Sequence, residues 1–438
     1  MENTLNKTPS ASRTHIGFFG RMNAGKSSIV NAFTGQSVSI VSDTAGTTTD
    51  VVTKSMEIHG IGPCILLDTA GFDDTGALGS LRTEAARKAA DRCDIAVVVF
   101  SPLENASAVN STEDREKQPA GTAESAEKTG DYAVEREWIA RFRDRETPVI
   151  GVIGKADTLS PEKAEEMAKA LSSGFHIPVL PVSAVTREGI VALKEEFIRS
   201  FKQTEKKRYI TGDLVERGDA VLLVMPQDIQ APDGRLILPQ VQTIRELLDR
   251  KCVVTCCTTD ELDDALLQCK EPPKLIITDS QVFDRVYEKK PEKSLLTSFS
   301  ILFAAYKGDI DYYVESAKAI DKLTEDSRVL IAECCTHAPL EEDIGRVKIP
   351  RFLRKKAGEG LTIDMTAGAD FPENLEDYDL VIQCGACMFN RKFVLARTAR
   401  AKAAGVPMTN YGVTIAHLKG ILGKVETGAK NTREEIMS

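Results

Sequence analysis

A glycine-rich loop near the N-terminus places the strongest constraint on the fold. The stretch GRMNAGKSS, residues 20–28, fits the pattern G-x-x-x-x-G-K-[ST] and lies between an apolar run, HIGFF, and a helical pattern, SIVNAFTG. In this context, backbone N–H groups of the loop and of the helix N-terminus bind phosphate oxygens, and the glycines let the backbone come close. The sequence therefore predicts a strand, a phosphate-binding loop and a helix at the start of an α/β domain.

The side chains of this loop predict how it would hold a nucleoside triphosphate and its metal ion. We expect Lys26 to reach the β- and γ-phosphates and Ser27 to offer its hydroxyl to Mg²⁺. The loop residues expected to contact the nucleotide are Gly20, Asn23, Ala24, Gly25, Lys26, Ser27 and Ser28.

Two stretches further along the chain predict the rest of the phosphate and metal site. In LLDTAG, Asp68 stands at the end of an apolar strand, where its carboxylate can hold Mg²⁺ through water. Gly71 of the same stretch can donate its N–H to the γ-phosphate. In the loop AGTTTD, Thr48 is the first choice for the second Mg²⁺ hydroxyl, and Thr47 is the alternative.

Two later loops indicate that the base is guanine. VIGKAD, which contains Lys155, follows an apolar strand, and its Asp157 can accept hydrogen bonds from the N1 and N2 hydrogens of guanine. VSAV can supply a backbone N–H to the guanine carbonyl through Ser183 or Ala184. The order and spacing of these motifs resemble the TrmE–Era–EngA–septin-like group of GTPases, which implies GTP and GDP as ligands.

The chain departs from that group at Gly154, where the group's Asn-Lys-x-Asp motif has asparagine. The asparagine side chain normally ties the base-binding loop to the phosphate loop. We expect specificity for guanine to persist through Asp157. We expect nucleotide affinity to fall by about 1–2 kcal/mol, the scale of a hydrogen bond of a partly buried polar group.

A second departure concerns hydrolysis. The residue after DTAG is Phe72, where Ras-like enzymes have a glutamine that orients water. Asn23 is similar to the asparagine that binds K⁺ in the potassium-activated members of the group, so the resemblance implies a K⁺ ion in place of an arginine finger. The candidate catalytic residues are Asn23, Lys26, Thr48, Asp68 and Gly71.

Apolar runs that alternate with helical patterns predict three α/β domains. In the first, THIGFFG, PCILLDTAG, DIAVVVF, TPVIGVIG and IPVLPVSA predict a parallel sheet covered on both faces. We place a P-loop GTPase domain at residues 1–208, a small three-strand α/β domain at residues 209–297 and a doubly wound domain at residues 298–438. Residues 101–131, which lack periodicity, are expected to form a disordered insertion.

Charge, hydropathy and cysteine content indicate which partners and which cellular compartment to expect. The 438 residues carry a formal net charge of −9, which argues against nucleic acid or an anionic membrane as the main partner. No run of 18 apolar residues predicts a membrane span, and the polar N-terminus lacks an apolar signal core. We therefore expect a cytoplasmic protein with reduced cysteines. The cysteines expected to pack in the core are Cys64, Cys93, Cys252, Cys256 and Cys257.

A C-x-x-C pair near the C-terminus predicts a metal site. QCGAC and the stretch CTH each follow an apolar strand, so they should meet at one edge of a sheet. Cys335, Cys384 and Cys387 would then supply three thiolates, which suits a 4Fe–4S cluster with an open fourth position. A structural zinc site of the same cysteines with His337 is the alternative, and three buried thiols without metal are the third possibility.

The complete pattern resembles the HydF family of FeFe-hydrogenase maturation GTPases. The resemblance rests on the potassium-type GTPase motifs, the small middle domain, C-T-H followed by C-x-x-C, and the stretches CTHAPLEEDIGRVKIPR and APDGRLILPQVQ. It favours the cluster over zinc, and it implies a scaffold that carries a precursor of the hydrogenase di-iron subcluster to the FeFe-hydrogenase apoprotein. It also implies two radical-SAM maturases as partners and dimerisation through the middle domain, as a homodimer or a higher oligomer.

The fourth cluster position is where the chain departs from the family. The family often has His-Cys-x-x-Cys, whereas Gln383 precedes the first cysteine here, and an amide is a poor iron ligand. His337 and Glu342 remain as candidates, and Glu342 is similar to a carboxylate that can ligate the cluster in family members. Either would be a weak ligand that an incoming precursor can displace.

A function of another class is a ribosome- or tRNA-associated GTPase with a structural zinc domain. The GTPase motifs and the cysteines are compatible with it. The acidic charge and the absence of an RNA-binding module argue against it.

Overall fold

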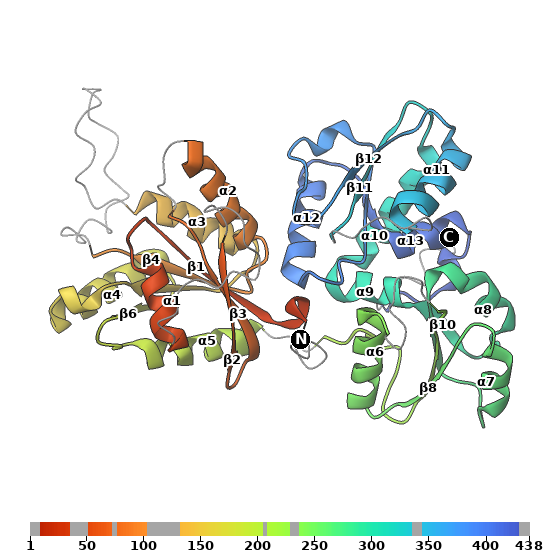
Figure 1. The fold of residues 1–438 in the computed structure, drawn as a ribbon, viewed down its shortest axis with the longest axis horizontal. Coiled ribbons are helices and arrows are strands. Elements are labelled where there is room, and N and C mark those ends of the chain that lie inside the picture. The colour runs from red at the N-terminus through yellow and green to blue at the C-terminus, as the bar shows by residue number, and fades with distance from the viewer. Residues whose placement is uncertain are drawn as a thin grey trace, which may run out of the picture. The chain divides into compact units, whose positions relative to one another are not determined.

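The chain folds into two compact units, Met1–Lys206 and Lys207–Ser438 (Figure 1). The computed structural model describes residues 9–35, 51–71, 77–102, 132–204, 208–227, 236–334 and 344–428. Nearly all of the predicted insertion, residues 103–131, lies outside these ranges. Within them, no helix is both long and apolar enough to cross a membrane.

The first unit is built on a six-stranded sheet with the order β2-β3-β1-β4-β5-β6. All neighbouring strands are parallel except β2 and β3, which are antiparallel. The five apolar runs of the sequence all form strands of this sheet, as predicted. The strands are β1 (Thr14–Gly20), β2 (Val52–Ile58), β3 (Gly62–Asp68), β4 (Ile95–Phe100), β5 (Val149–Ile153) and β6 (Val179–Pro181).

Strand β2 was not predicted from the sequence. It lies at the edge of the sheet, and its side chains alternate between half-buried and exposed over most of its length. An edge strand with one solvated face lacks the continuous apolar run that marks the buried parallel strands.

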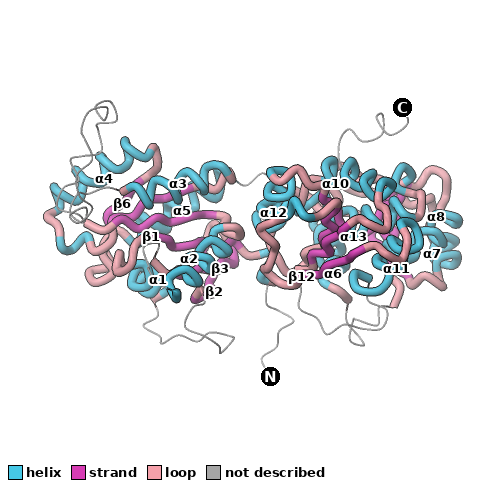
Figure 2. The backbone as a smooth tube through the Cα atoms, turned by 90° about the horizontal axis from the view of Figure 1, so that it is seen from above, coloured by secondary structure: helices cyan, strands magenta, loops and turns pink. Residues whose placement is uncertain are grey.

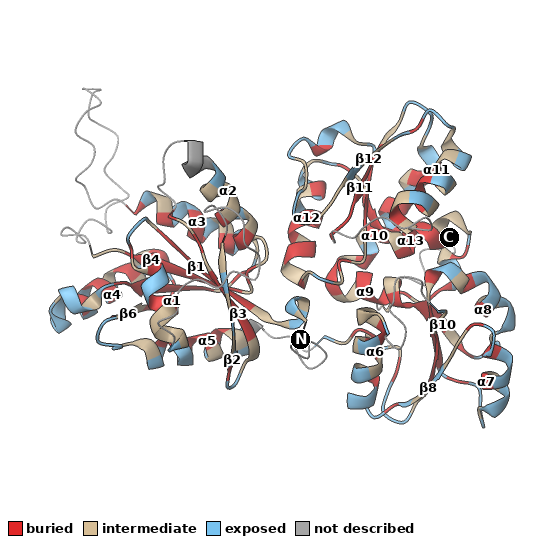
Figure 3. Cartoon of the chain, in the orientation of Figure 1, coloured by how far each residue is buried: buried red, intermediate tan, exposed pale blue. Residues whose placement is uncertain are grey.

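Helices cover both faces of this sheet (Figure 2). One core joins the strands to α1 and α5 through Ile29 and Phe197, and the other joins them to α3 and α4 through Phe142 and Leu171. The strands are the most deeply buried part of the unit (Figure 3). The helices are α1 (Lys26–Thr34), α2 (Ala77–Ala90), α3 (Ala133–Asp144), α4 (Pro161–Phe175) and α5 (Ile190–Thr204).

The second unit contains two four-stranded parallel sheets, with the orders β10-β9-β7-β8 and β12-β11-β13-β14. The first comprises β7 (Ala220–Val224), β8 (Val253–Cys257), β9 (Leu275–Thr278) and β10 (Leu295–Ser298). The second comprises β11 (Arg328–Ala332), β12 (Thr362–Thr366), β13 (Leu380–Gln383) and β14 (Met408–Asn410). The sheet of the middle region therefore has four strands rather than the three expected, because the short β10 adds to its edge.

Eight helices of the described ranges pack against these two sheets. One continuous hydrophobic core includes Leu222 and Ile276 of the first sheet, Ile301 of α9, and Leu330 and Ile382 of the second sheet. The two sheets are thus joined by shared apolar packing. The helices are α6 (Leu238–Asp249), α7 (Leu262–Gln268), α8 (Phe283–Lys289), α9 (Phe299–Lys307), α10 (Ile310–Ala317), α11 (Ile349–Ala357), α12 (Arg391–Ala403) and α13 (Tyr411–Leu418).

The cysteines that were expected to be structural are mostly buried. Cys64, Cys93 and Cys252 lie in the core, and Cys257 is half-buried. Cys256 is exposed, so its assignment to the core is wrong. It lies on β8, which forms the edge of its sheet.

Candidate functional site

The phosphate loop connects β1 to α1, and its residue types shape its backbone. Gly20 has a φ of 150°, and a Cβ there would overlap the carbonyl oxygen of Val99. Gly25, with a φ of 97°, precedes α1 in a left-handed conformation that glycine adopts without strain. Asn23 has a φ of 60°, which asparagine tolerates better than most residues. The loop therefore needs both glycines of the motif.

Lys26 is buried and folds back over the loop. Its Nζ donates to the carbonyl oxygens of Gly20 (3.0 Å) and Arg21 (2.8 Å). Ala24 is also buried, whereas Ser27 and Ser28 of the first helical turn are exposed. The ammonium group can exchange its two carbonyl partners for phosphate oxygens, which are stronger acceptors.

Asp68 and Ser27 offer oxygen ligands at the end of β3. Because Phe18 pairs with Asp68 across β1 and β3, the carboxylate lies beside the phosphate loop. Its Oδ1 is buried and has no hydrogen-bond partner among the described residues. Burial raises the pKa of Asp68, and the Ser27 hydroxyl and the Lys26 ammonium oppose that shift. A buried carboxylate oxygen without a partner, beside a serine hydroxyl, fits Mg²⁺.

An ion pair between a half-buried arginine and a buried glutamate ties the phosphate loop to α3. Arg21 donates from Nε and Nη2 to the two carboxylate oxygens of Glu135, at 2.8 Å and 3.1 Å. Glu135 is completely buried. A bidentate pair of this kind fixes geometry as well as charge, so α3 helps to set the position of the loop. Sequence patterns did not identify this pair, because the two residues lie 114 positions apart.

The structure brings Asp157 and Ser183, two of the residues predicted to bind the base, into direct contact. The Ser183 hydroxyl donates to Asp157 Oδ1 at 2.6 Å and accepts from the backbone N–H groups of Val185 (3.2 Å) and Thr186 (3.0 Å). Ser183 is buried, whereas Asp157 is exposed. The carboxylate is therefore oriented by one oxygen and keeps acceptor capacity for a ligand. The remaining predicted residues of this region are the exposed Lys155, the half-buried Ala184 and the buried Gly71.

Gly154 brings the base-binding loop into direct contact with the phosphate loop. A Cβ at this position would overlap the carbonyl oxygen of Ala24 and come within 3.1 Å of a Val99 methyl group. The N–H of Gly154 donates to the carbonyl of Phe100 at 3.0 Å, which holds the backbone in place. Close backbone packing therefore joins the two loops directly at this point.

Cys384 lies at the end of β13, where a second cysteine meets it. β13 pairs with β11 so that Gln383 lies opposite Ala332, and Cys334 follows β11 two residues later. The backbone N–H of Cys334 donates to Cys384 Sγ at 3.0 Å, and the N–H of Ala386 donates at 3.4 Å. The Cys334 thiol and these N–H groups lower the pKa of Cys384. The site therefore stabilises a thiolate, the form that binds metal.

Lys307 fixes the C-x-x-C loop through hydrogen bonds to its backbone. This buried lysine at the end of α9 donates to the carbonyl oxygens of Ala386 (2.9 Å), Cys387 (3.2 Å) and Phe389 (2.8 Å). Three contacts from one ammonium group fix the loop between Cys384 and α12. Cys384 and Cys387 are both half-buried, so the loop is partly open to solvent.

A buried acidic residue ties together the chain on either side of residues 335–343. Arg346 donates from Nε (3.1 Å) and Nη2 (3.0 Å) to Oε2 of the buried Glu333, and the Tyr411 hydroxyl donates to its Oε1 at 3.3 Å. Gln383 is also buried, and its Oε1 has no hydrogen-bond partner in the described part of the chain.

Several of the predicted residues fall outside the described ranges. In the nucleotide site these are Thr47, Thr48 and Phe72, and in the cysteine site they are Cys335, His337 and Glu342. Within the described ranges, no group of three or more His, Cys, Asp and Glu side chains is arranged to hold a metal ion. Of the predicted ligands of the cysteine site, the structure describes Cys384 and Cys387. Their thiols fit a soft metal centre that takes further ligands from elsewhere in the chain.

Comparison with protein families matches three consecutive parts of the chain. Residues 15–130 match the 50S ribosome-binding GTPase family. Residues 210–308 match the hydrogen maturase F dimerization domain, and residues 311–426 match the hydrogen maturase F tetramerization domain.

Curated relatives are similar to the GTPase part. GTPase Der of Wolinella succinogenes is 31% identical over 206 residues, which are 45% of this chain and 37% of the relative. The tRNA modification GTPase MnmE of Pseudothermotoga lettingae is 27% identical over 231 residues, which are 52% of this chain and 42% of the relative. The chain thus spans about two fifths of the length of these relatives.

Comparison with solved structures also matches GTPases. Era in complex with MgGDPNP and a 16S ribosomal RNA segment is 16% identical, with a TM-score of 0.33, over 56% of this chain and 92% of that chain. A GDP·AlF₄⁻-bound variant of NFeoB from S. thermophilus is 19% identical, with a TM-score of 0.29, over 43% of this chain and 64% of that chain.

The contact at Gly154 leads to a prediction that reverses the expectation from the motif. Gly154→Asn should weaken GDP binding rather than restore it, because the new Cβ pushes the base-binding loop away from Ala24. A loss of about tenfold in affinity, roughly 1.4 kcal/mol, is expected by isothermal titration calorimetry. Gly154→Ala, which adds only the Cβ, should show most of the loss. Tighter GDP binding by Gly154→Asn would mean that the backbone contact is not what joins the loops.

Proposed function

The chain belongs to the hydrogen maturase F family, and on that premise we propose that it is a GTP-hydrolysing scaffold in the maturation of FeFe-hydrogenase. One observation carries the proposal: a phosphate-binding GTPase loop and a thiolate-stabilising C-x-x-C loop occur in one chain. The substrate is a di-iron precursor that the chain receives with the help of two radical-SAM maturases. The FeFe-hydrogenase apoprotein accepts it in the cytoplasm.

The nucleotide site supports binding and hydrolysis of GTP with Mg²⁺. Lys26 exchanges its loop carbonyls for the β- and γ-phosphates, and Ser27 with Asp68 holds Mg²⁺. Asp157, oriented by Ser183, accepts the hydrogens of the guanine edge. Thr48 completes the metal site, and the Gly71 N–H binds the γ-phosphate. The ion pair of Arg21 and Glu135 holds the phosphate loop in position relative to these groups.

The cysteine site supports a 4Fe–4S cluster. Cys384, Cys387 and Cys335, which directly follows Cys334 in the chain, supply the three thiolates, and His337 or Glu342 stands at the fourth position. The cluster supplies a metal position at which a precursor can be held. The chain's own part is to fix the C-x-x-C loop through Lys307 and to donate N–H groups to Cys384.

Metal analysis with variants of both sites tests this proposal. Protein purified without oxygen should contain about four iron and four sulfide per chain, as one 4Fe–4S cluster requires. Cys384→Ser and Cys387→Ser should each lose most of the iron, whereas Cys256→Ala, which removes an exposed thiol elsewhere, should keep it. Lys26→Ala should keep the iron and lose GTP hydrolysis. Zinc in place of iron, or iron that survives both serine substitutions, would remove the cluster from the proposal.

Potassium should accelerate hydrolysis. Asn23 lies in the phosphate loop with a φ of 60°, and the resemblance to the potassium-activated GTPases implies that its side chain contributes to a K⁺ site. We expect faster GTP hydrolysis in KCl than in NaCl at equal ionic strength, and no such difference in Asn23→Ala. Equal rates of the unchanged protein in the two salts would eliminate the K⁺ site.

The middle sheet offers a surface for a homodimer. β8 is an edge strand, and Val253 on it is 61% exposed. Val241 and Leu248 of the adjacent α6 are also exposed. An exposed apolar edge strand is a template for pairing with another chain. This surface lies in the part of the chain that matches a dimerization domain.

A charge on this edge should break the association. Val253→Lys is expected to halve the molar mass measured by light scattering after size-exclusion chromatography. Leu267→Lys is the matched control, because Leu267 lies on α7 in the same region and is 83% exposed. An unchanged mass for Val253→Lys would assign the dimer contact to another surface.

A further inference from the structure

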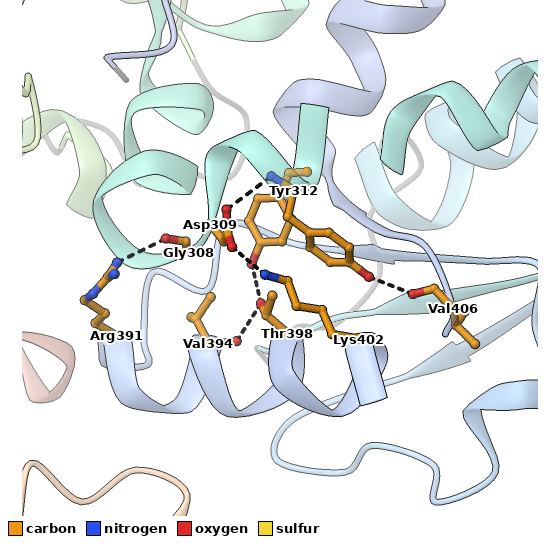
Figure 4. Close-up of polar contacts among 9 residues, drawn as sticks. Gly308, Asp309, Tyr312, Arg391, Val394, Thr398, Lys402 and Val406 are labelled. Carbon is orange, nitrogen blue, oxygen red and sulfur yellow. Dashed lines mark hydrogen bonds and ion pairs between the residues drawn. The ribbon is translucent and has the colours of Figure 1, made fainter. Parts of the chain in front are cut away.

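Helix α12 lies beside the C-x-x-C loop and is fixed by polar contacts to α9 and α10 (Figure 4). Arg391 at its start donates to the carbonyls of Tyr306 and Gly308, at 2.9 Å and 3.1 Å. Further along, the hydroxyls of Tyr313 and Thr398 lie 2.9 Å apart. Near its end Lys402 pairs with Asp309 at 2.6 Å. Contacts spread over three turns fix both the position and the rotation of α12.

On the same helix, Arg397 is only 3% exposed and reaches the cysteine site. Its Nη1 donates to Cys334 Sγ at 3.3 Å. Its Nη2 donates to the carbonyls of Gly368 and Asp370, each at 2.8 Å. The guanidinium also lies 4.9 Å from the ring centroid of Phe371. The side chain is therefore held in one place by contacts on several sides.

No carboxylate forms a salt bridge with Arg397 in the described part of the chain, although the charge of Asp370 acts on it from a distance. The contacts of Arg397 are two carbonyl oxygens, the rings of Phe371 and Phe393, and the sulfur of Cys334. A buried cation is costly unless an anion offsets it, and arginine stays protonated in proteins. The groups whose negative charge acts on Arg397 are the thiols of Cys334 and Cys384 and, to a smaller extent, the exposed carboxylate of Asp370. Cys384 is linked to this set through the N–H of Cys334.

We propose that Arg397 is a positioning residue of the cluster site: a buried, fixed positive charge that acts through Cys334 on the metal held by Cys384. Cys334 is a buried thiol beside Cys384 and would not be a ligand of the cluster. It is almost completely buried, receives the N–H of Arg397 on its sulfur and gives its own N–H to Cys384. This inference rests on the proposed cluster function and adds residues that lie outside the C-T-H and C-x-x-C motifs.

The arrangement has a defined consequence for reduction of the cluster. When one electron passes from a reductant such as dithionite to the cluster, the negative charge at the site grows by one. A fixed positive charge and N–H donors to sulfur both favour the more negative state, so they raise the reduction potential. Removal of the Arg397 charge should therefore make the midpoint potential more negative.

Arg400 offers a matched control on the same helix. It donates to the carbonyls of Phe371 (3.3 Å) and Pro372 (2.6 Å) and lies 5.0 Å from the ring centroid of Phe371. Both arginines thus anchor the same loop, and of the two only Arg397 has a contact with sulfur among the described residues. A role confined to anchoring this loop would give Arg397→Gln and Arg400→Gln similar effects on the midpoint potential.

The test uses the full-length protein with its cluster, purified without oxygen, and measures iron per chain, the EPR spectrum and the midpoint potential in a dye-mediated titration. Arg397→Gln should make the midpoint more negative, Arg397→Lys should stay closer to the unchanged protein, and Arg400→Gln should leave the midpoint unchanged. Cys334→Ala should keep its iron and shift the EPR spectrum and the midpoint. The Cys334→Ala variant tests the connection from Arg397 through Cys334 to Cys384 even if Arg397→Gln does not fold.

Each contrary result has a separate meaning. Equal midpoints for the unchanged protein, Arg397→Gln and Cys334→Ala would overturn the inference and leave the proposed function standing. An equal shift in Arg400→Gln would also overturn it, because the effect would then come from the loop. Loss of iron in Cys334→Ala to the level of Cys384→Ser would make Cys334 a ligand and overturn its assignment as a thiol that does not bind the metal. An unchanged protein without iron would contradict the proposed function itself.

Discussion

Hydrogen bonds between parallel strands bring the groups of each candidate site together. The pairing of β1 with β3 puts Asp68 beside the phosphate loop, and the pairing of β11 with β13 puts Cys334 beside Cys384. In both cases the residues come from distant parts of the sequence. Because all parallel strands end at the same edge of their sheet, one register fixes several loops at once. A shift of one residue in either pair would separate these groups.

Buried charged side chains then fix the loops that follow the strands. Lys26 binds two carbonyls of the phosphate loop, and Lys307 binds three carbonyls of the C-x-x-C region. Arg21 with Glu135, and Arg397 with its carbonyls and Cys334, have similar roles. Burial of such groups is costly, so their partners must be arranged closely. These buried charges lie at the phosphate loop and at the C-x-x-C loop, the two places where a bound ligand would contribute further charge.

Motifs with a fixed order predicted where several residues of the candidate nucleotide site lie in the fold. The phosphate loop, Asp68, Asp157 and Ser183 lie where the sequence indicated, because each follows a continuous apolar strand. The five main strands of the first sheet were predictable for the same reason. β2 and β10 were not, because one is an amphipathic edge strand and the other has only four residues. Lys307, Arg397 and Glu135 gave no signal, since a buried charged residue looks like a surface residue in sequence. At Gly154 the motif alone indicates the loss of an asparagine side chain, whereas the structure shows the backbone packed directly against Ala24.

Transfer of metal to a hydrogenase tests the central claim most directly. FeFe-hydrogenase apoprotein made without maturases would be mixed with this chain produced together with the two radical-SAM maturases, and hydrogen evolution would be measured. Hydrogen evolution with the unchanged chain, and none with Cys384→Ser, is the expected result. Equal hydrogen evolution with both proteins, or an inactive hydrogenase after mixing with chain that carries its full iron content, would contradict the role of the chain as a scaffold and carrier.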